Sequence, residues 1–142
     1  MRNSGKSATI LVVEDNEDNR VIYGTMLRAH GFVVQEAFSA EPAIAAVRTD
    51  PPDLVLMDIG LPAMDGVEAT RLLKSDPATA AIPVLALTAH ALSSERQRAL
   101  QAGVNGYLVK PISVAVLITE VERALGQSHS RPVEDNRASS ES

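Results

Sequence analysis

The sequence contains no cysteine and no tryptophan, and aromatic residues make up only 3% of its 142 residues. Without cysteine, a disulfide framework and a thiolate metal site are excluded. With so few aromatic side chains, the core must be built from aliphatic residues and alanine. The sequence also has no apolar stretch near the ~20 residues that a membrane-spanning helix requires. These absences argue against disulfide-rich, thiolate-metal and helical membrane proteins.

Positive charge is also limited, because the net charge is −5 and no dense block of Lys and Arg occurs. A nucleic-acid surface normally carries a basic stripe, so direct nucleic-acid binding is not expected. The first apolar segment, Ile10–Val13, is far too short for the apolar region of a secretion signal. We therefore expect a soluble, cytoplasmic protein that binds neither nucleic acid nor a membrane.

Short apolar runs bounded by turn residues alternate with segments whose apolar residues recur at helical spacing. Such runs predict strands that are buried on both faces. The expected strands are residues 9–13, 32–37, 53–58, 82–87 and 104–109. The second is the most polar, which is typical of a sheet edge. The expected helices lie between Asn16 and Gly31 and at 40–47, 67–74, 91–102 and 114–125.

This alternation predicts an α/β fold in which a parallel sheet is covered by helices on both faces. Right-handed crossovers leave few topologies. The flavodoxin-like, doubly wound (βα)5 fold, with a five-stranded parallel sheet of order 2-1-3-4-5, places the polar second strand at the edge. One domain is expected over residues 9–125. Residues 1–8 are expected to be a flexible N-terminus, and the Ser-rich residues 126–142 a disordered tail.

Polar residues follow four of the predicted strands at their C-terminal ends: Glu14, Asp15, Asp58, Thr88 and Lys110. In this topology those ends share one crevice. Carboxylates at close range need compensating cations, because like charges raise each other's pKa. Lys110 supplies one positive charge. A divalent ion that prefers oxygen ligands, Mg²⁺ by default with Mn²⁺ as the alternative, would supply the rest.

Asp58 is the best nucleophile candidate, because it ends a central strand and precedes a loop that contains Pro and Gly. A carboxylate can accept a phosphoryl group. Phosphoryl transfer chiefly needs in-line positioning and positive charge on the transferred oxygens. The divalent ion and Lys110 would supply that charge, and the Thr88 hydroxyl could donate to a third oxygen. Glu14 and Asp15 would then be metal ligands.

Each of these residues also has a purely structural interpretation. Asp58 could be a loop residue, Thr88 a buried strand hydroxyl and Lys110 a solvated surface charge. Their combination on one edge of the sheet is a stronger signal than any of them alone. The phosphate-loop patterns G-x-x-x-x-G-K and G-x-G-x-x-G and the zinc pattern H-E-x-x-H are absent. The three histidines, at positions 30, 90 and 129, are too scattered for a metal cluster.

Four motifs resemble those of the receiver domains of bacterial two-component response regulators. They are V-V-E-D-N at 12–16, L-M-D-I-G-L-P-A-M-D-G at 56–66, L-T-A at 87–89 and Y-L-V-K-P at 107–111. The resemblance covers about residues 9–125 and is to single-domain receivers of the CheY and DivK type. It implies a phosphoacceptor, not a turnover enzyme. The phosphoryl donor would be a sensor histidine kinase or a histidine phosphotransfer protein, and the output protein binding or onward relay.

The resemblance also implies roles for individual residues, with Asp58 as the phosphoacceptor. The implied Mg²⁺ ligands are Asp15, Asp58 and the backbone carbonyl of Gly60, with Glu14 contributing through water. The implied phosphate-binding residues are Thr88, Ala89 and Lys110. The Lys110–Pro111 bond is implied to be cis, a geometry that is nearly confined to bonds before proline, and to aim the Lys110 amine at Asp58.

Thr88 and Tyr107 are the implied switch pair. When Thr88 turns towards the phosphoryl group, Tyr107 would rotate inward and remodel the surface of the fourth helix, fifth strand and fifth helix for a downstream protein. Gly60 and His90 flank the implied path of the hydrolytic water, so we expect them to tune the lifetime of the phosphorylated state. The protein is expected to be a monomer or a dimer linked to phosphorylation.

Two alternatives remain open at this point. One is a phosphatase or phosphotransferase with an aspartyl-phosphate intermediate. Such enzymes of the haloacid-dehalogenase type carry a second Asp two residues after the nucleophile, where this chain has Gly60. The other is a receiver that acts as a constitutive scaffold. The intact acidic pair Glu14–Asp15, together with Thr88 and Lys110, argues against it.

Overall fold

The computed structural model describes residues 7–60, 66–89 and 93–129. These residues form five strands that alternate with five helices. The strands are β1 (Thr9–Val13), β2 (Val33–Ala37), β3 (Leu54–Asp58), β4 (Val84–Thr88) and β5 (Gly106–Val109). The helices are α1 (Glu17–Ala29), α2 (Ala40–Thr49), α3 (Gly66–Ser75), α4 (Ser93–Ala102) and α5 (Val114–His129). Within the described ranges, no helix is both long and apolar enough to span a membrane.

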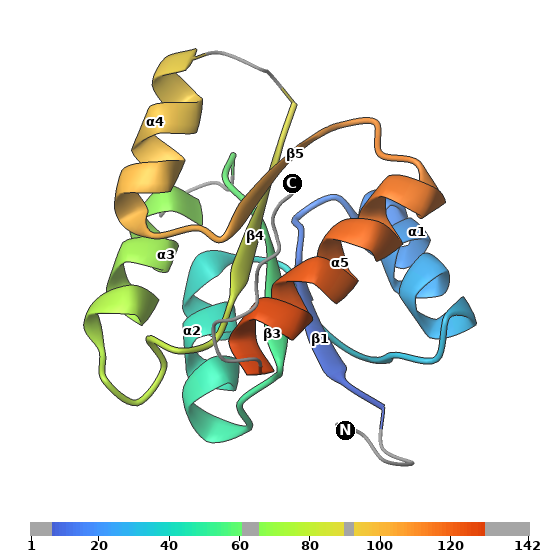
Figure 1. Ribbon diagram of the computed structural model, residues 1–142, viewed down its shortest axis with the longest axis horizontal. Coiled ribbons are helices and arrows are strands. Elements are labelled where there is room, and N and C mark those ends of the chain that lie inside the picture. The colour runs from blue at the N-terminus through green and yellow to red at the C-terminus, as the bar shows by residue number, and fades with distance from the viewer. Residues whose placement is uncertain (1–6, 61–65, 90–92, 130–142) are drawn as a thin grey trace.

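The strands form one parallel sheet of order β2-β1-β3-β4-β5, which confirms the predicted topology (Figure 1). The central strand β3 lies between β1 and β4. Its Met57 pairs with Val13, and its Asp58 pairs with Leu87. The C-terminal ends of β1, β3 and β4 therefore meet at one edge of the sheet.

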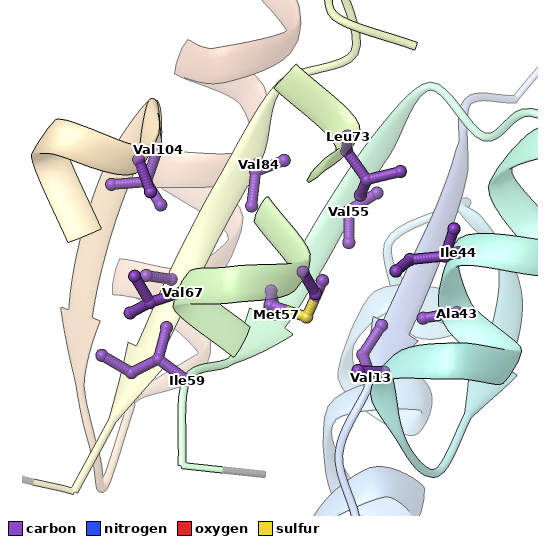
Figure 2. Close-up of a cluster of buried hydrophobic side chains, with 14 of the residues drawn as sticks. Val13, Ala43, Ile44, Val55, Met57, Ile59, Val67, Leu73, Val84 and Val104 are labelled. Carbon is purple, nitrogen blue, oxygen red and sulfur yellow. The ribbon is translucent and has the colours of Figure 1, made fainter. Parts of the chain in front are cut away.

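Helices cover both faces of the sheet and enclose two apolar cores. Successive strand residues face opposite sides, so β3 contributes to both cores. Leu54 and Leu56 pack with side chains of α1 and α5. Val55 and Met57 pack with those of α2, α3 and α4 (Figure 2). Apart from Thr9 and Asp58, the residues of β1 and β3 are all apolar and buried, as expected for strands that helices cover on both faces.

Local chemistry explains where the helices begin and end. Asn16 caps α1, because its side chain accepts a hydrogen bond from the Asn19 backbone N–H at 2.9 Å. Gly31 and Gly103 follow α1 and α4 with φ of +91° and +107°, a left-handed conformation that glycine adopts without strain. Gly31 is the residue at which the sequence predicts the end of the first helix, and Gly103 directly follows the predicted fourth helix, residues 91–102.

Several element boundaries differ from the sequence prediction. β4 begins at Val84, after Pro83, whose nitrogen has no proton for the ladder. β5 begins at Gly106, because the Val104 N–H bonds back to the Ala99 carbonyl at 3.2 Å. α5 continues through Gly126 to His129, so residues 126–129 of the predicted tail are helical.

The remaining terminal predictions fall mostly on residues that are not described. Residues 1–6 of the expected N-terminal segment and residues 130–142 of the expected tail lie outside the described ranges. So do residues 91–92 of the expected fourth helix, which is described from Ser93 onward.

Candidate functional site

The acidic residues predicted to meet at the sheet edge do meet there. The register of β1 and β3 places Glu14, directly after Val13, next to Asp58. One carboxylate oxygen from each of Glu14, Asp15 and Asp58 lies within 4.8 Å of the other two. Glu14 is 1% exposed and Asp58 6% exposed, whereas Asp15 is exposed. The cluster therefore has a buried floor and an open rim.

Glu14 is held by the backbone around it. Its N–H donates to the Ala37 carbonyl at 3.1 Å, which continues the β1–β2 ladder by one residue. Its Oε2 accepts from the Asn16 N–H at 3.2 Å. Arg20 Nη1 donates to the Glu14 carbonyl at 2.9 Å, and Arg20 also pairs with Glu36. Arg20 was not among the predicted site residues. The sequence signal for it is its place one turn after the helix cap Asn16, on the face of α1 that meets the strand ends.

Asp58 has a partner for each carboxylate oxygen. Oδ1 accepts from the Gly60 N–H at 2.9 Å, and Oδ2 lies 3.3 Å from Lys110 Nζ. Lys110 Nζ also lies 3.0 Å from Glu14 Oε1, so one ammonium bridges the two buried carboxylates. The Lys110–Pro111 peptide bond is cis, as the resemblance implies.

The start of α3 packs directly against the end of β3. A Cβ on Gly66 would lie 2.3 Å from the Asp58 carbonyl oxygen and 2.6 Å from Ile59 Cα. The Gly66 N–H donates to the Ile59 carbonyl at 3.3 Å. Only glycine permits this approach, so residue 66 fixes where the loop after Asp58 returns to the sheet. Residues 61–65 of that loop lie outside the described ranges.

The buried charged groups shift one another's pKa values. Burial is the largest influence on Glu14 and raises the pKa of its carboxyl, against the opposing effect of the Lys110 ammonium. Burial alone would lower the pKa of Lys110, but the neighbouring Glu14 and Asp58 carboxylates outweigh it and the pKa is raised. Lys110 is therefore held as the charged ammonium.

The cluster fits a hard divalent cation. Three carboxylates face one ammonium within the described site, so the fully ionised cluster keeps an excess of negative charge. Every ligand atom that it offers is an oxygen, the donor that Mg²⁺ and Mn²⁺ prefer. Glu14 Oε1 is buried and has no hydrogen bond of good geometry, only its ion pair with Lys110. Such an atom is well suited to an electrostatic or water-mediated role beside a cation.

The other predicted site residues that the structure describes lie on β4 and β5 or directly after β4. Thr88, 3% exposed at the end of β4, donates its hydroxyl to Glu95 Oε1 on α4 at 2.9 Å. Ala89 follows it and is exposed. Tyr107 is partly buried on β5, with the Arg96 guanidinium 5.9 Å from its ring centroid. His90 lies outside the described residues. Glu95 was not among the predicted site residues. The sequence signal for it is an acidic residue in a predicted helix that has few apolar positions.

A cleft of about 350 Å³ opens beside the site, between α1 and the segment after β5. It is lined by Asn19, Ile22, Tyr23, Met26, Ala89, Lys110, Pro111 and Ile112. Tyr23 is buried there, and this burial raises the pKa of its phenol. The cleft gives a second molecule access to Lys110 from the α1 side.

The fold and the acidic edge define a receiver domain. Residues 10–122 match the response regulator receiver domain family, and the chain belongs to this family. It is thus a two-component signalling module that is phosphorylated on aspartate and works with a histidine kinase, and it is a phosphoacceptor, not a turnover enzyme. The family membership decides against the phosphatase-type enzyme, and the intact acidic cluster with Lys110 argues against the constitutive scaffold.

Individual relatives agree with this assignment. The polar-differentiation response regulator DivK of Brucella ovis is 38% identical over 120 residues, which are 84% of this chain and 98% of DivK. A putative response regulator from Chloroflexus aurantiacus has 31% identity and a TM-score of 0.83 over 86% of this chain and 100% of its own. The receiver domain of a Pseudomonas aeruginosa sensor histidine kinase has 37% identity and a TM-score of 0.80 over 85% and 99%. That structure contains a magnesium ion coordinated in the active-site cleft.

Proposed function

We propose that Asp58 is the phosphoacceptor and that its phosphoryl donor is a histidine of a sensor kinase or phosphotransfer protein. The observation that carries this proposal is the position of the Asp58 carboxylate, at the end of the central strand and between the Gly60 N–H and the Lys110 ammonium. Each of the two Asp58 oxygens accepts a hydrogen bond, whereas Glu14 Oε1 has only its ion pair with Lys110. The Asp58 carboxylate is therefore oriented before a donor arrives.

In the transfer step an Asp58 carboxylate oxygen attacks the phosphorus of the donor phosphohistidine. The new P–O bond forms as the P–N bond breaks, and the electron pair of the P–N bond returns to the donor imidazole. Lys110, 3.3 Å from Asp58, is placed to neutralise charge on the transferred oxygens. The Gly60 N–H keeps the carboxylate in position, and the Ala89 backbone next to Thr88 is the further phosphate contact.

We propose Mg²⁺, with Mn²⁺ as a substitute, as the cofactor of this site. When bound, it supplies positive charge for the transferred oxygens. Asp15, Asp58 and the Gly60 carbonyl would hold it, and Glu14 would act through water. The mutual approach of the Glu14, Asp15 and Asp58 carboxylates supports this ligand set, as does the magnesium ion in the Pseudomonas aeruginosa receiver.

The output is proposed to use Thr88 and Tyr107 as the switch and the surface of α4, β5 and α5 as the docking face for a downstream protein. Large apolar side chains are exposed on all three elements: Leu100, Val109, Val114 and Val116. Phosphorylation either regulates this face in a monomer or promotes a dimer. Gly60, together with His90, tunes the phosphoryl lifetime. A cytoplasmic location, without nucleic acid as a partner, agrees with the family and with the net charge of −5.

Intact mass measurement after incubation with acetyl phosphate and Mg²⁺ tests the assignment of Asp58. The wild-type protein is expected to gain one phosphoryl group that is lost on standing, because acyl phosphates hydrolyse. Asp58→Asn is expected to gain none. Omission of Mg²⁺ should remove most of the labelling.

Asp50→Asn is the matched control, since it removes one carboxylate from the opposite end of the sheet and leaves an oxygen that can still accept from Gln35. This control should label like the wild type. Equal labelling of wild type and Asp58→Asn would reject Asp58 as the acceptor, and an unlabelled wild type would reject the proposed function altogether.

A further inference from the structure

A hydrogen bond ties the end of β4 to α4 beside the phosphoacceptor. Thr88 Oγ1 donates to Glu95 Oε1 at 2.9 Å. Thr88 is buried and Glu95 is half-buried, so solvent competes weakly for this bond on the threonine side. Since Asp58 pairs with Leu87 in the sheet, the residue that makes this bond directly follows the residue opposite Asp58.

The bond uses the only proton that the Thr88 side chain can give. A threonine hydroxyl donates one hydrogen bond, and an ionised carboxylate only accepts. The same hydroxyl cannot donate at once to Glu95 and to a phosphoryl oxygen on Asp58. The two acceptors therefore compete for one donor, and whatever stabilises one contact weakens the other.

The bond also matters for the position of α4, which has little apolar packing. Among residues 94–102, the buried side chains are Ala99 and Ala102, and Leu100 is about half exposed. The neighbouring residue, Arg96, places its guanidinium over the Tyr107 ring. Adjacent residues of α4 thus contact the end of β4 and the aromatic side chain of β5.

We propose that Glu95 is a positioning residue that holds the Thr88 hydroxyl in the unphosphorylated state, so that phosphorylation of Asp58 must withdraw this donor from α4. The inference rests on the proposed function of Asp58. Loss of the Thr88–Glu95 bond frees the N-terminal half of α4, and the shift of α4 carries Arg96 away from Tyr107. Glu95 accordingly sets how far the domain favours the inactive arrangement.

Beryllofluoride, a mimic of the acyl phosphate that binds the acceptor carboxylate, tests this competition in the presence of Mg²⁺. Glu95→Ala removes the competing acceptor and is expected to bind beryllofluoride about threefold to tenfold more tightly, because the bond lost is charge-assisted but partly exposed. Glu95→Gln keeps a neutral acceptor and should fall between Glu95→Ala and the wild type. Gln97→Ala, an exposed change on the same helix, should bind like the wild type.

A double mutant separates competition for the hydroxyl from general loosening of α4. In a Thr88→Val background there is no proton to compete for, so Glu95→Ala should leave beryllofluoride affinity unchanged. An equal gain in both backgrounds would overturn the proposal. Unchanged or weaker binding by Glu95→Ala alone would also overturn it. Failure of the wild type to bind would instead count against the proposed function of Asp58.

The methyl resonance of Thr88 provides a second measurement, in which the variant itself needs no bound ligand. In unphosphorylated Glu95→Ala it is expected to move towards its position in beryllofluoride-bound wild type, because the side chain is released from α4. A resonance that stays at the wild-type position would contradict the proposal, even if Thr88→Val binds too weakly for the affinity comparison.

Discussion

Gly66 lies so close to the end of β3 that it has no space for a side chain. A Cβ there would meet backbone atoms of Asp58 and Ile59, which cannot move aside as the tip of a side chain can. Gly66→Ala is expected to lower the free energy of unfolding by about 1–3 kcal/mol or more. Urea denaturation followed by circular dichroism measures this change.

Gly126→Ala is the control for this prediction. Gly126 lies in α5, where an added Cβ would meet nothing within 4 Å. The substitution is expected to be neutral or to stabilise by up to about 1 kcal/mol, because alanine is the better helix former. Similar losses at residues 66 and 126 would show that close approach to β3 is not the cause.

At the scale of the residue, the sequence predicts which side chains lie at the strand ends better than it predicts which helix side chains contact them. Glu14, Asp58 and Lys110 could be placed together because parallel strands carry their C-terminal residues to one edge. The contacts of Arg20 and Glu95 depend on the rotation of α1 and α4 about their own axes. No local pattern in the sequence fixes that rotation.

The helices differ in how much apolar surface they bury against the core, and α4 and α2 can be compared directly. Each has ten residues. The buried residues of α2 are Ala40, Ala43, Ile44 and Val47, whereas those described in α4 are Ala99 and Ala102. Less buried apolar area gives a lower cost of local opening.

Amide hydrogen exchange is therefore expected to be faster in residues 94–102 of α4 than in α2. Glu95→Ala should increase exchange in α4 further, because it removes the bond to Thr88, and should leave α2 unchanged. Mass spectrometry of peptides from the two helices measures the difference. Equal protection of α2 and α4 would contradict the link between buried area and local opening.

The same comparison explains which elements the sequence predicts well. β1 and β3 are apolar apart from Thr9 and Asp58, and their ends agree with the prediction to within one residue. β4 and β5 begin later than their apolar runs, because Pro83 and the backbone bond of Val104 to Ala99 interrupt the pattern. α5 extends beyond the last residue of its apolar stripe and ends at His129. Helix ends and strand starts depend on such backbone bonds, which apolar periodicity does not report.

At the scale of the whole molecule, the sheet separates two apolar cores that share β3. Leu56 and Met57 are neighbours in sequence and both 0% exposed, yet they belong to opposite cores. Leu56→Ala and Met57→Ala are each expected to destabilise the domain by about 2–5 kcal/mol. Because β3 is common to both cores, each variant should still unfold in a single transition.

Chemical denaturation followed by two probes tests this coupling: far-ultraviolet circular dichroism for the backbone and tyrosine absorbance for the side chains. The transitions should coincide in both variants. Val116→Ala, at a position of α5 that is 47% exposed, should change stability by less than about 0.5 kcal/mol. Separate transitions for the two probes would show that the cores unfold independently.

The overall topology could be predicted because five apolar strands in alternation with helices, joined by right-handed crossovers, leave few sheet orders. The polarity of β2 marks it as an edge, and the sheet order agrees. The division of side chains between the two cores follows from alternation along each strand once that order is known.

The small buried face of α4 has a consequence for how this domain can be engineered. Since Ala99 and Ala102 provide the described buried contacts, outward positions such as Gln97, Leu100 and Gln101 can be exchanged with little effect on folding. If α4 forms part of the docking face proposed above, sequence change at these outward positions is constrained by partners and not by packing. A library restricted to these positions would alter the choice of partner while the phosphorylation chemistry at the sheet edge stays the same.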